Sequence, residues 1–192
     1  MATKGVAAEC PGPGMMARML RVGLAVMAAF LLLGLPQNLA PFIATPEDVV
    51  DRMLVLAGVT KDDVVYDLGC GDGRIPIAAA KKYGAHGVGI DIDPKRIEES
   101  KANAKAAGVE HLVRFRVENA LTADVSAATV VTLYLLSSSN RALRPLLQRQ
   151  LKPGARIVSH AFSMGSDWPA DKVDQFVSAR GDEVTLYLWR LR

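Results

Sequence analysis

The sequence has few of the residues that hold small disulfide-bonded or metal-bound folds together. Its 192 residues include two cysteines and three histidines. Cys10 and Cys70 lie far apart along the chain, and the histidines show no ligand spacing. The sequence therefore predicts neither a disulfide framework nor a bound metal.

The chain also has little excess of charge of either sign. The formal net charge is +3, and the first 40 residues carry +2 of it. Residues 41–192 are close to neutral and contain no basic stripe, which argues against nucleic acid as the main partner. Half of the residues are hydrophobic and 22% are charged, so we expect a packed core and exclude extensive disorder.

An apolar run sets the amino-terminal segment apart. Two arginines precede the 14 apolar residues at 22–35, in the order found in signal peptides and signal anchors. The run would form about 21 Å of helix, against ~30 Å for a bilayer core. Residues 15–20 and 36–43 would have to extend it for a full span.

The same segment lacks a clear cleavage site. The nearest candidate, residues 38–40, is followed by Pro41, which disfavours cleavage. We expect residues 1–40 to form a tail and a hydrophobic helix that holds the chain at a membrane through residues of about 15–40. A cleaved signal peptide and a buried or mis-assigned leader are the alternatives. Residues 41–192 would form one domain.

Residues 41–192 alternate between helical and strand patterns. Strands interleaved with helices at this spacing predict a doubly wound α/β fold with a mostly parallel sheet. Helices are expected from an N-cap at Thr45 to residue 58, over 76–83 and 94–107, and again between 137 and 151. Strands are expected at 64–66, 87–90, 113–117, 129–136, 156–159 and 184–191, the last paired with 173–177.

A glycine-rich turn follows the first of these strands. Asp67 ends the strand, and Gly69, Gly71 and Gly73 follow at alternate positions. Glycine permits a positive φ and a close approach of the backbone to a ligand, and ligands of open parallel sheets bind beyond the carboxyl ends of the strands. The turn, Cys70 included, is the expected ligand site, but we do not expect Cys70 to act as a nucleophile.

The spacing of the turn distinguishes between nucleotide-like ligands. A dinucleotide-binding turn would have its third glycine at Arg74. S-adenosylmethionine (SAM) has no pyrophosphate but carries a cationic amine, which Asp67 is placed to bind. Asp91, 24 residues later at the end of the second strand, is placed for the ribose hydroxyls. The pattern favours SAM over NAD, and over a tight turn in some other α/β protein.

At these residues the chain resembles the class I, seven-strand SAM-dependent methyltransferases, over about residues 49–192. Residues 67–73 are similar to the first motif of that family and residues 88–91 to the second. The resemblance implies a Rossmann-like sheet of seven strands and SAM as cofactor. It also places residues 118–120 near the adenine amine. Asn119 departs from the acid common there, and its amide oxygen is expected to accept the same hydrogen bond.

A narrower resemblance concerns the methyl acceptor. Residues 41–46, 65–67, 132–136 and 156–160 are similar to a small lysine-methyltransferase family. That family includes the enzymes that methylate the ATP synthase c subunit and the adenine nucleotide translocase, and its members carry a hydrophobic segment before the catalytic domain. The resemblance implies a protein-lysine N-methyltransferase that acts at or near a membrane.

Three features near the expected site have more than one interpretation. Tyr134, just past the fourth strand, is the candidate catalytic residue that lines the methyl-transfer channel, and simple packing is an equal alternative. His160, after the fifth strand, is more simply a strand cap than a proton acceptor. Residues 41–45 either fold over the cofactor or link the anchor to the domain.

Other functions stay open. A compact methyltransferase without a recognition domain can serve a small molecule as well as a protein, and a SAM-binding module without catalysis is a third possibility. The fourth strand is not followed by an Asn-Pro-Pro-Tyr motif, which argues against methylation of nucleic-acid bases. We expect the domain on the SAM-containing side of the membrane, although the basic residues before the apolar run predict the opposite side.

Overall fold

A computed structural model describes residue 39 and residues 42–192. The predicted hydrophobic helix and its cleavage site lie outside these residues, so the anchor and the division at residue 40 stay predictions. No helix in the described part of the chain is long and apolar enough to cross a membrane.

Helices and strands alternate along most of the described chain, which confirms the doubly wound α/β prediction. The helices are α2 (Glu47–Ala57), α3 (Arg74–Tyr83), α4 (Pro94–Ala106) and α5 (Ser137–Gln150). The strands are β1 (Val64–Leu68), β2 (His86–Asp91), β3 (Val113–Val117), β4 (Val130–Leu133), β5 (Arg156–His160), β6 (Lys172–Val177) and β7 (Glu183–Arg190).

The strands form one sheet in the order β3-β2-β1-β4-β5-β7-β6. β1 to β5 are parallel, and β7 runs antiparallel to both β5 and β6. The predicted seven-strand, mostly parallel sheet and the predicted pairing of its last two strands are thus confirmed. The chain builds outward from β1 to β3 and then returns to place β4 on the other side of β1. The carboxyl ends of β1 and β4 therefore flank the topological switch point, where ligands of such sheets bind.

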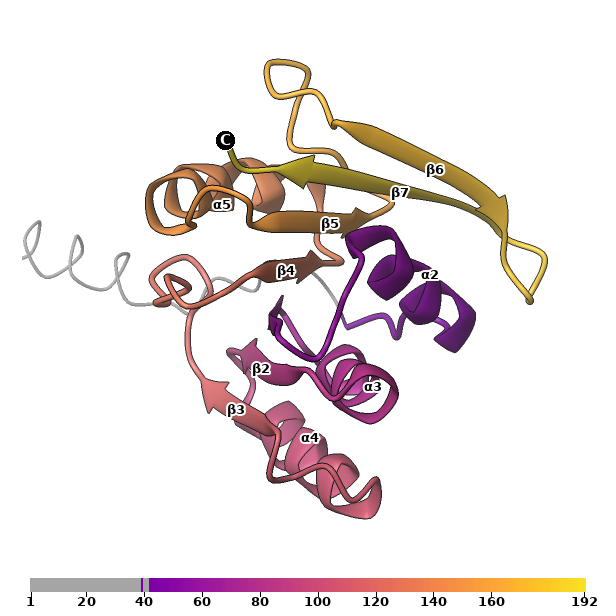
Figure 1. Ribbon diagram of the computed structural model, residues 1–192, viewed down its shortest axis with the longest axis vertical. Helices are drawn as coiled ribbons and strands as arrows, with labels where there is room; N and C mark the ends of the chain where they lie inside the picture. Colours follow the sequence, from indigo (N-terminus) through magenta and orange to yellow (C-terminus); the bar gives the residue numbers. More distant parts are fainter. Residues whose placement is uncertain (1–38, 40–41) are drawn as a thin grey trace, which may run out of the picture. The chain divides into compact units, whose positions relative to one another are not determined.

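Helices cover both faces of the sheet (Figure 1). α5 packs on one face through Leu143 and Leu147, in a cluster that includes Leu133 of β4. α2 and α3 pack on the other face, in a cluster that includes Val130 of β4. Because β4 is covered on both sides, all four of its residues are buried, which explains why this segment reads as a continuous apolar run.

Several boundaries differ from the sequence prediction by one to three residues, and two of the differences have a clear physical reason. β4 ends at Leu133 and not at residue 136, because the chain leaves the sheet there to begin α5. α2 is preceded by Pro46 as N-cap, with no side-chain cap bond, so Thr45 is not the cap. Thr45 is buried, and its carbonyl oxygen accepts a hydrogen bond from Nη1 of Arg74 at 2.7 Å.

Candidate functional site

The glycine-rich turn lies between β1 and α3 at the carboxyl edge of the sheet. Gly69, Gly71 and Gly73 all have positive φ, at 84°, 53° and 78°, a conformation that side chains with a Cβ rarely adopt. These positions also leave little room for a side chain. A Cβ atom at Gly71 would collide with the ring of Phe42, and one at Gly73 would lie 2.8 Å from Cε1 of Phe115. Glycine is therefore required at these positions for two independent reasons.

Asp67 is a buried acid at the end of β1. It is 3% exposed, and Oγ1 of Thr132 donates a hydrogen bond to its Oδ1 at 2.8 Å. Burial raises the pKa of Asp67 to about 7; the hydrogen bond opposes this rise, and the charges of Asp91 and Asp72 add to it. A cation bound beside Asp67 would favour its ionised form.

Asp91 ends β2 and faces the same turn. Its Oδ2 accepts a hydrogen bond from the backbone N–H of Gly71 at 2.9 Å, and its Oδ1 accepts one from that of Asp93 at 3.0 Å. Each carboxylate oxygen can accept more than one hydrogen bond. The two backbone donors thus fix the carboxylate and leave it able to receive two hydroxyl groups.

Helix α4 holds the turn from the other side. Oγ of Ser100, a buried residue, donates to the carbonyl oxygen of Gly71 at 2.8 Å, and Nδ2 of Asn103 donates to that of Asp72 at 3.0 Å. Neither Ser100 nor Thr132 is among the predicted site residues. Two sequence features could have indicated their roles: a serine on the buried side of a helix and a threonine inside an apolar strand.

Cys70 lies beneath the turn. The residue is 4% exposed, and a Cβ at Gly89 would come within 2.8 Å of its Sγ. Its backbone N–H donates a hydrogen bond to the carbonyl oxygen of Ile90 at 3.0 Å. Burial, with the nearby acids, raises the pKa of the thiol, which disfavours the thiolate that a nucleophilic cysteine needs. Its predicted contact with a cofactor stays a prediction.

Asn119 occupies the turn after β3. Its Oδ1 accepts a hydrogen bond from the backbone N–H of Leu121 at 3.0 Å, so the side chain already stabilises its own turn. The amide oxygen keeps a second lone pair. The predicted hydrogen bond from an adenine amine is compatible with this arrangement.

Residues 42–45 lie against the glycine-rich turn. Besides the contact of Phe42 with Gly71, the guanidinium carbon of Arg96 lies 3.8 Å from the centroid of the Phe42 ring. Phe42 therefore packs directly on the turn at Gly71, and the predicted cover over the cofactor stays a prediction.

Tyr134 and His160 stack on each other at the carboxyl edge of the sheet. Their ring centroids are 3.9 Å apart with an angle of 27° between the ring planes. Asp67 is opposite Thr132 in the pairing of β1 with β4, and Tyr134 comes two residues later. Tyr134 therefore directly follows the end of β4, the strand that neighbours β1 and its Asp67. The carboxyl edge of the sheet therefore has a part rich in acids and glycines, which includes Asp67 and Asp91, and an aromatic part formed by Tyr134 and His160.

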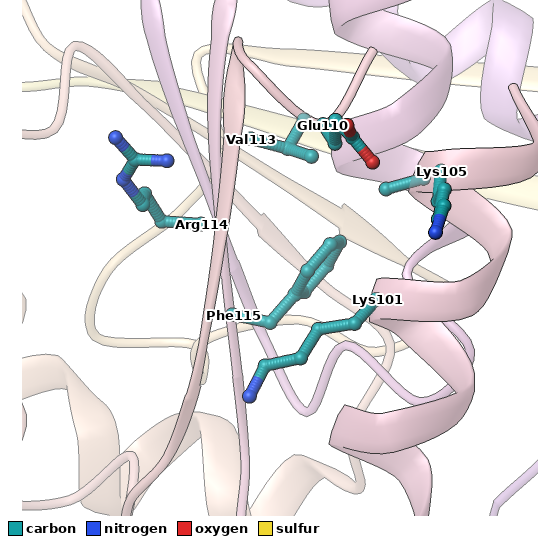
Figure 2. Close-up of a pocket in the computed structure, with 7 residues that line it drawn as sticks. Lys101, Lys105, Glu110, Val113, Arg114 and Phe115 are labelled. Atoms are coloured by element: carbon teal, nitrogen blue, oxygen red, sulfur yellow. The ribbon is translucent and has the colours of Figure 1, made fainter. Parts of the chain in front are cut away.

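A separate pocket of about 370 Å³ opens between α4 and β3 (Figure 2). None of the predicted site residues lines it, so it is distinct from the candidate site. Its lining consists of Lys101, Ala104, Lys105, Glu110, Val113, Arg114 and Phe115.

Comparisons with known proteins point to one enzyme class. The model of the ANTKMT methyltransferase domain family matches residues 67–172. A protein-lysine N-methyltransferase of Saccharolobus islandicus (strain REY15A) is 49% identical over 125 residues, which cover 65% of this chain and 78% of that protein. A ribosomal protein L11 methyltransferase of Photorhabdus laumondii is 41% identical over 91 residues, but the match spans only 30% of that protein.

A solved structure extends the similarity to the fold. The crystal structure of an RNA methyltransferase from Salinibacter ruber, in complex with S-adenosyl-L-homocysteine (SAH), matches with a TM-score of 0.72 and 53% identity. The match covers 78% of this chain and 94% of that one. The names of these relatives agree on methyl transfer and differ in the acceptor.

Proposed function

Because the chain belongs to the ANTKMT methyltransferase domain family and is a SAM-dependent methyltransferase, we propose that it methylates the side-chain amine of lysine in a protein. The observation that carries the proposal is the carboxyl edge of the sheet. There the acids and glycines suited to SAM lie beside a stacked pair of uncharged aromatic rings, Tyr134 and His160. The similarity to a protein-lysine N-methyltransferase over 78% of its length supports the same acceptor.

The chemistry of the donor groups fits SAM. A buried carboxylate, Asp67, suits a cationic amine, and Asp91, with both oxygens fixed by backbone N–H groups, suits the ribose diol. We assign Gly69, Gly71 and Gly73 to close backbone contact with the cofactor. Cys70 and Asn119 would complete its surroundings as the sequence predicts.

When bound, SAM supplies a methyl group on a sulfonium sulfur; the lone pair of the acceptor nitrogen forms the new bond to the methyl carbon, and the electron pair of the breaking carbon–sulfur bond stays on sulfur. The protein mainly has to align the two groups and exclude water, which is worth ~7–11 kcal/mol in favourable cases. A lysine must first lose its proton, and uncharged, partly buried surroundings favour the neutral amine. Tyr134, half-buried beside His160, would line the path of that amine.

One assay can distinguish between protein and RNA, the two kinds of methyl acceptor that the names of the relatives indicate. The purified enzyme is incubated with tritium-labelled SAM and an extract of cells that lack its gene, and the products are treated with protease or with ribonuclease. We expect protease-sensitive label, and ε-N-methyl-lysine after acid hydrolysis. Ribonuclease-sensitive label would replace the proposal with RNA methylation, and label in the low-molecular-weight filtrate would replace it with a small-molecule acceptor.

Two variants control this assay. Asp67→Ala removes the carboxylate proposed to bind SAM and should abolish label in every fraction. Asp62→Asn makes a matched change of charge on an exposed neighbour and should leave labelling unchanged. A cellular role that survives in Asp67→Ala would favour a function of the protein without catalysis.

We propose further that residues of about 15–40 hold the enzyme at a membrane, with the catalytic domain on the side that contains SAM. The basic residues followed by an apolar run support the attachment to a membrane. The side is proposed from the need for SAM, since the charge order by itself predicts the opposite side. Membrane fractionation of the full chain, with and without residues 1–37, tests the attachment. A full chain that remains in the soluble fraction, or that loses its amino-terminal segment by cleavage, would contradict it.

A further inference from the structure

His160 ends β5 at the aromatic part of the carboxyl edge. Only 6% of the residue is exposed, and its ring is stacked on Tyr134 at 3.9 Å between centroids. In the pairing of β5 with β7, His160 lies opposite Leu186, which is itself fully buried. The ring is therefore held between the end of the sheet and the tyrosine that borders the proposed path of the acceptor.

The backbone directly after His160 is strained. Ala161 has a φ of 64° and is the one non-glycine residue with positive φ among residues 39 and 42–192. Across it, the backbone N–H of Phe162 donates to the carbonyl oxygen of His160 at 2.8 Å. This hydrogen bond and φ are those of the rare γ-turn, a conformation that costs about 1–3 kcal/mol and persists only where the surroundings enforce it.

Three side-chain hydrogen bonds enforce this turn. Oγ of Ser159 donates to the carbonyl oxygen of Phe162 at 2.6 Å, and Nδ2 of Asn140 donates to the same oxygen at 2.9 Å. Nδ2 of Asn140 also donates to Oγ of Ser159 at 3.0 Å. Because Asn140 belongs to α5 and is fully buried, the first turn of α5 and the end of β5 fix the position of His160 together.

The ring itself has an unsatisfied nitrogen. Nδ1 of His160 is enclosed and has no hydrogen-bond partner in the described part of the chain. Buried polar atoms without partners are uncommon and call for an explanation such as an absent ligand or water. Burial also lowers the pKa of His160 to about 4, so the imidazole is neutral at physiological pH and one of its nitrogens carries a free lone pair.

From this geometry we propose that His160 is an acceptor-site residue: entry of the acceptor uncovers Nδ1, which then accepts a hydrogen bond from the acceptor nitrogen and thereby points that nitrogen's lone pair at the methyl group. The inference rests on the proposed function, because it requires an acceptor with an N–H group. The ring takes the hydrogen bond and not the proton, which passes to solvent. The strained turn and the Tyr134 stack keep the ring in place for this contact.

Two substitutions separate hydrogen bonding from packing. His160→Phe keeps a ring that can stack on Tyr134 but removes both nitrogens. His160→Asn gives up the stack but places an amide oxygen close to the position of Nδ1. The rate of ε-N-methyl-lysine formation is measured on proteins of the gene-deleted extract with tritium-labelled SAM, and the affinity for SAH is measured by calorimetry.

We expect His160→Phe to lower the methylation rate about tenfold, which is the effect of one lost hydrogen bond. Its SAH affinity should stay within about twofold of wild type. His160→Asn should retain at least threefold more activity than His160→Phe. His111, which is exposed in a turn, supplies the matched control, and His111→Phe should change neither quantity.

The outcomes separate the two proposals. If the wild type forms no ε-N-methyl-lysine, the proposed function fails and the inference with it. If the wild type forms it and His160→Phe is as active, the inference alone is overturned. It is also overturned if both variants lose SAH affinity in proportion to activity, since His160 would then support the fold or the cofactor. Should His160→Phe fail to fold, a His160→Asn variant that binds SAH but is no more active than background overturns it.

Discussion

The carboxylate of Asp67 shows how one side chain can set the pH response of the site. With a pKa raised to about 7 by burial, Asp67 is mostly neutral in the free protein at pH 6 and mostly ionised at pH 8. A ligand with a cationic amine binds the ionised form better. Cofactor binding should therefore be linked to the loss of one proton from Asp67.

We predict that the affinity for SAH rises about tenfold between pH 6 and pH 8 in the wild type, because the ionised fraction of Asp67 rises by about that factor. Asp67→Asn should bind SAH more weakly at pH 8 and should show little change between the two pH values. Calorimetric titrations at both values check this. A wild-type affinity independent of pH would mean that Asp67 does not face the amine.

Ala161 is the second residue with an unusual environment. Its φ of 64° suits glycine, and the residue is exposed, so the methyl group contributes little packing. We predict that Ala161→Gly leaves the free energy of unfolding unchanged or raises it by up to about 1 kcal/mol. The same change should lower the methylation rate, because His160 is then held less firmly.

Urea unfolding and the labelling assay measure the two quantities on the same preparation. A variant that is both less stable and fully active would show that Ala161 is not strained and that the turn does not position His160.

At the scale of whole elements, a partly buried ion pair links strands at the edge of the sheet opposite the site. Asp63, just before β1, pairs with Nη2 of Arg156 in β5. Its Oδ1 also accepts a hydrogen bond from Oγ1 of Thr129 at 2.7 Å, and its Oδ2 accepts one from the N–H of Thr60 at 2.8 Å. The carboxylate thus ties β1 to the chain segments that begin β4 and β5.

Removal of this charge should weaken the fold without touching the site. We predict that Asp63→Asn lowers the free energy of unfolding by about 2 kcal/mol, since Asp63 is 5% exposed and Arg156 would lose its partner. The Asp62→Asn change, one residue away and exposed, should cost less than about 0.5 kcal/mol. Urea unfolding measures both values, and SAH affinity should be unchanged in both.

The pH dependence of this contribution has a definite sign. Burial opposes ionisation of Asp63, but the hydrogen bonds of Thr129 and Thr60 and the charge of Arg156 outweigh it and lower its pKa. The stabilisation is therefore present above the ordinary pKa of 3.8 and is lost as the pH falls through the lower value of the folded state. The difference between wild type and Asp63→Asn should shrink only in acid; a difference that shrinks near neutral pH would contradict this assignment.

The helices and strands were predictable because the signals that define them are local. Apolar periodicity and glycines placed α3, α4 and β1 to β3 within a few residues. The end of β4 was not predictable, because the residues after Leu133 are also apolar, and only the start of α5 shows where the sheet ends.

The site was predictable where glycines and acids follow strands, as at Asp67, Gly71 and Asp91. The roles of Thr132, Ser100 and Asn140 depend on partners 65, 29 and 19 residues away. Nothing in their immediate neighbours indicates those partners, and the positive φ of Ala161 gives no sequence signal. These contacts arise from the way the sheet brings distant segments together.

At the scale of the whole molecule, the complete seven-stranded sheet lies within the described residues. We predict that a chain without residues 1–37 folds and binds SAH with the wild-type affinity, because the proposed cofactor residues and the core that positions them remain. Calorimetry and thermal unfolding of both chains measure this. A truncated chain that aggregates or loses SAH affinity would show that the amino-terminal segment is part of the working domain.

The placement of β4 beside β1 also sets an order of events during synthesis. β1, the glycine-rich turn and β2 leave the ribosome early, but Asp67 receives its hydrogen bond only from Thr132, 65 residues later. The aromatic pair needs His160, later still. Because β4 lies between β1 and β5 in the sheet, a nascent chain shorter than about the first 160 residues exposes unpaired strand edges. We therefore expect a growing chain to bind SAH only after β4 has emerged, so that cofactor binding would report when β4 has joined the sheet beside β1.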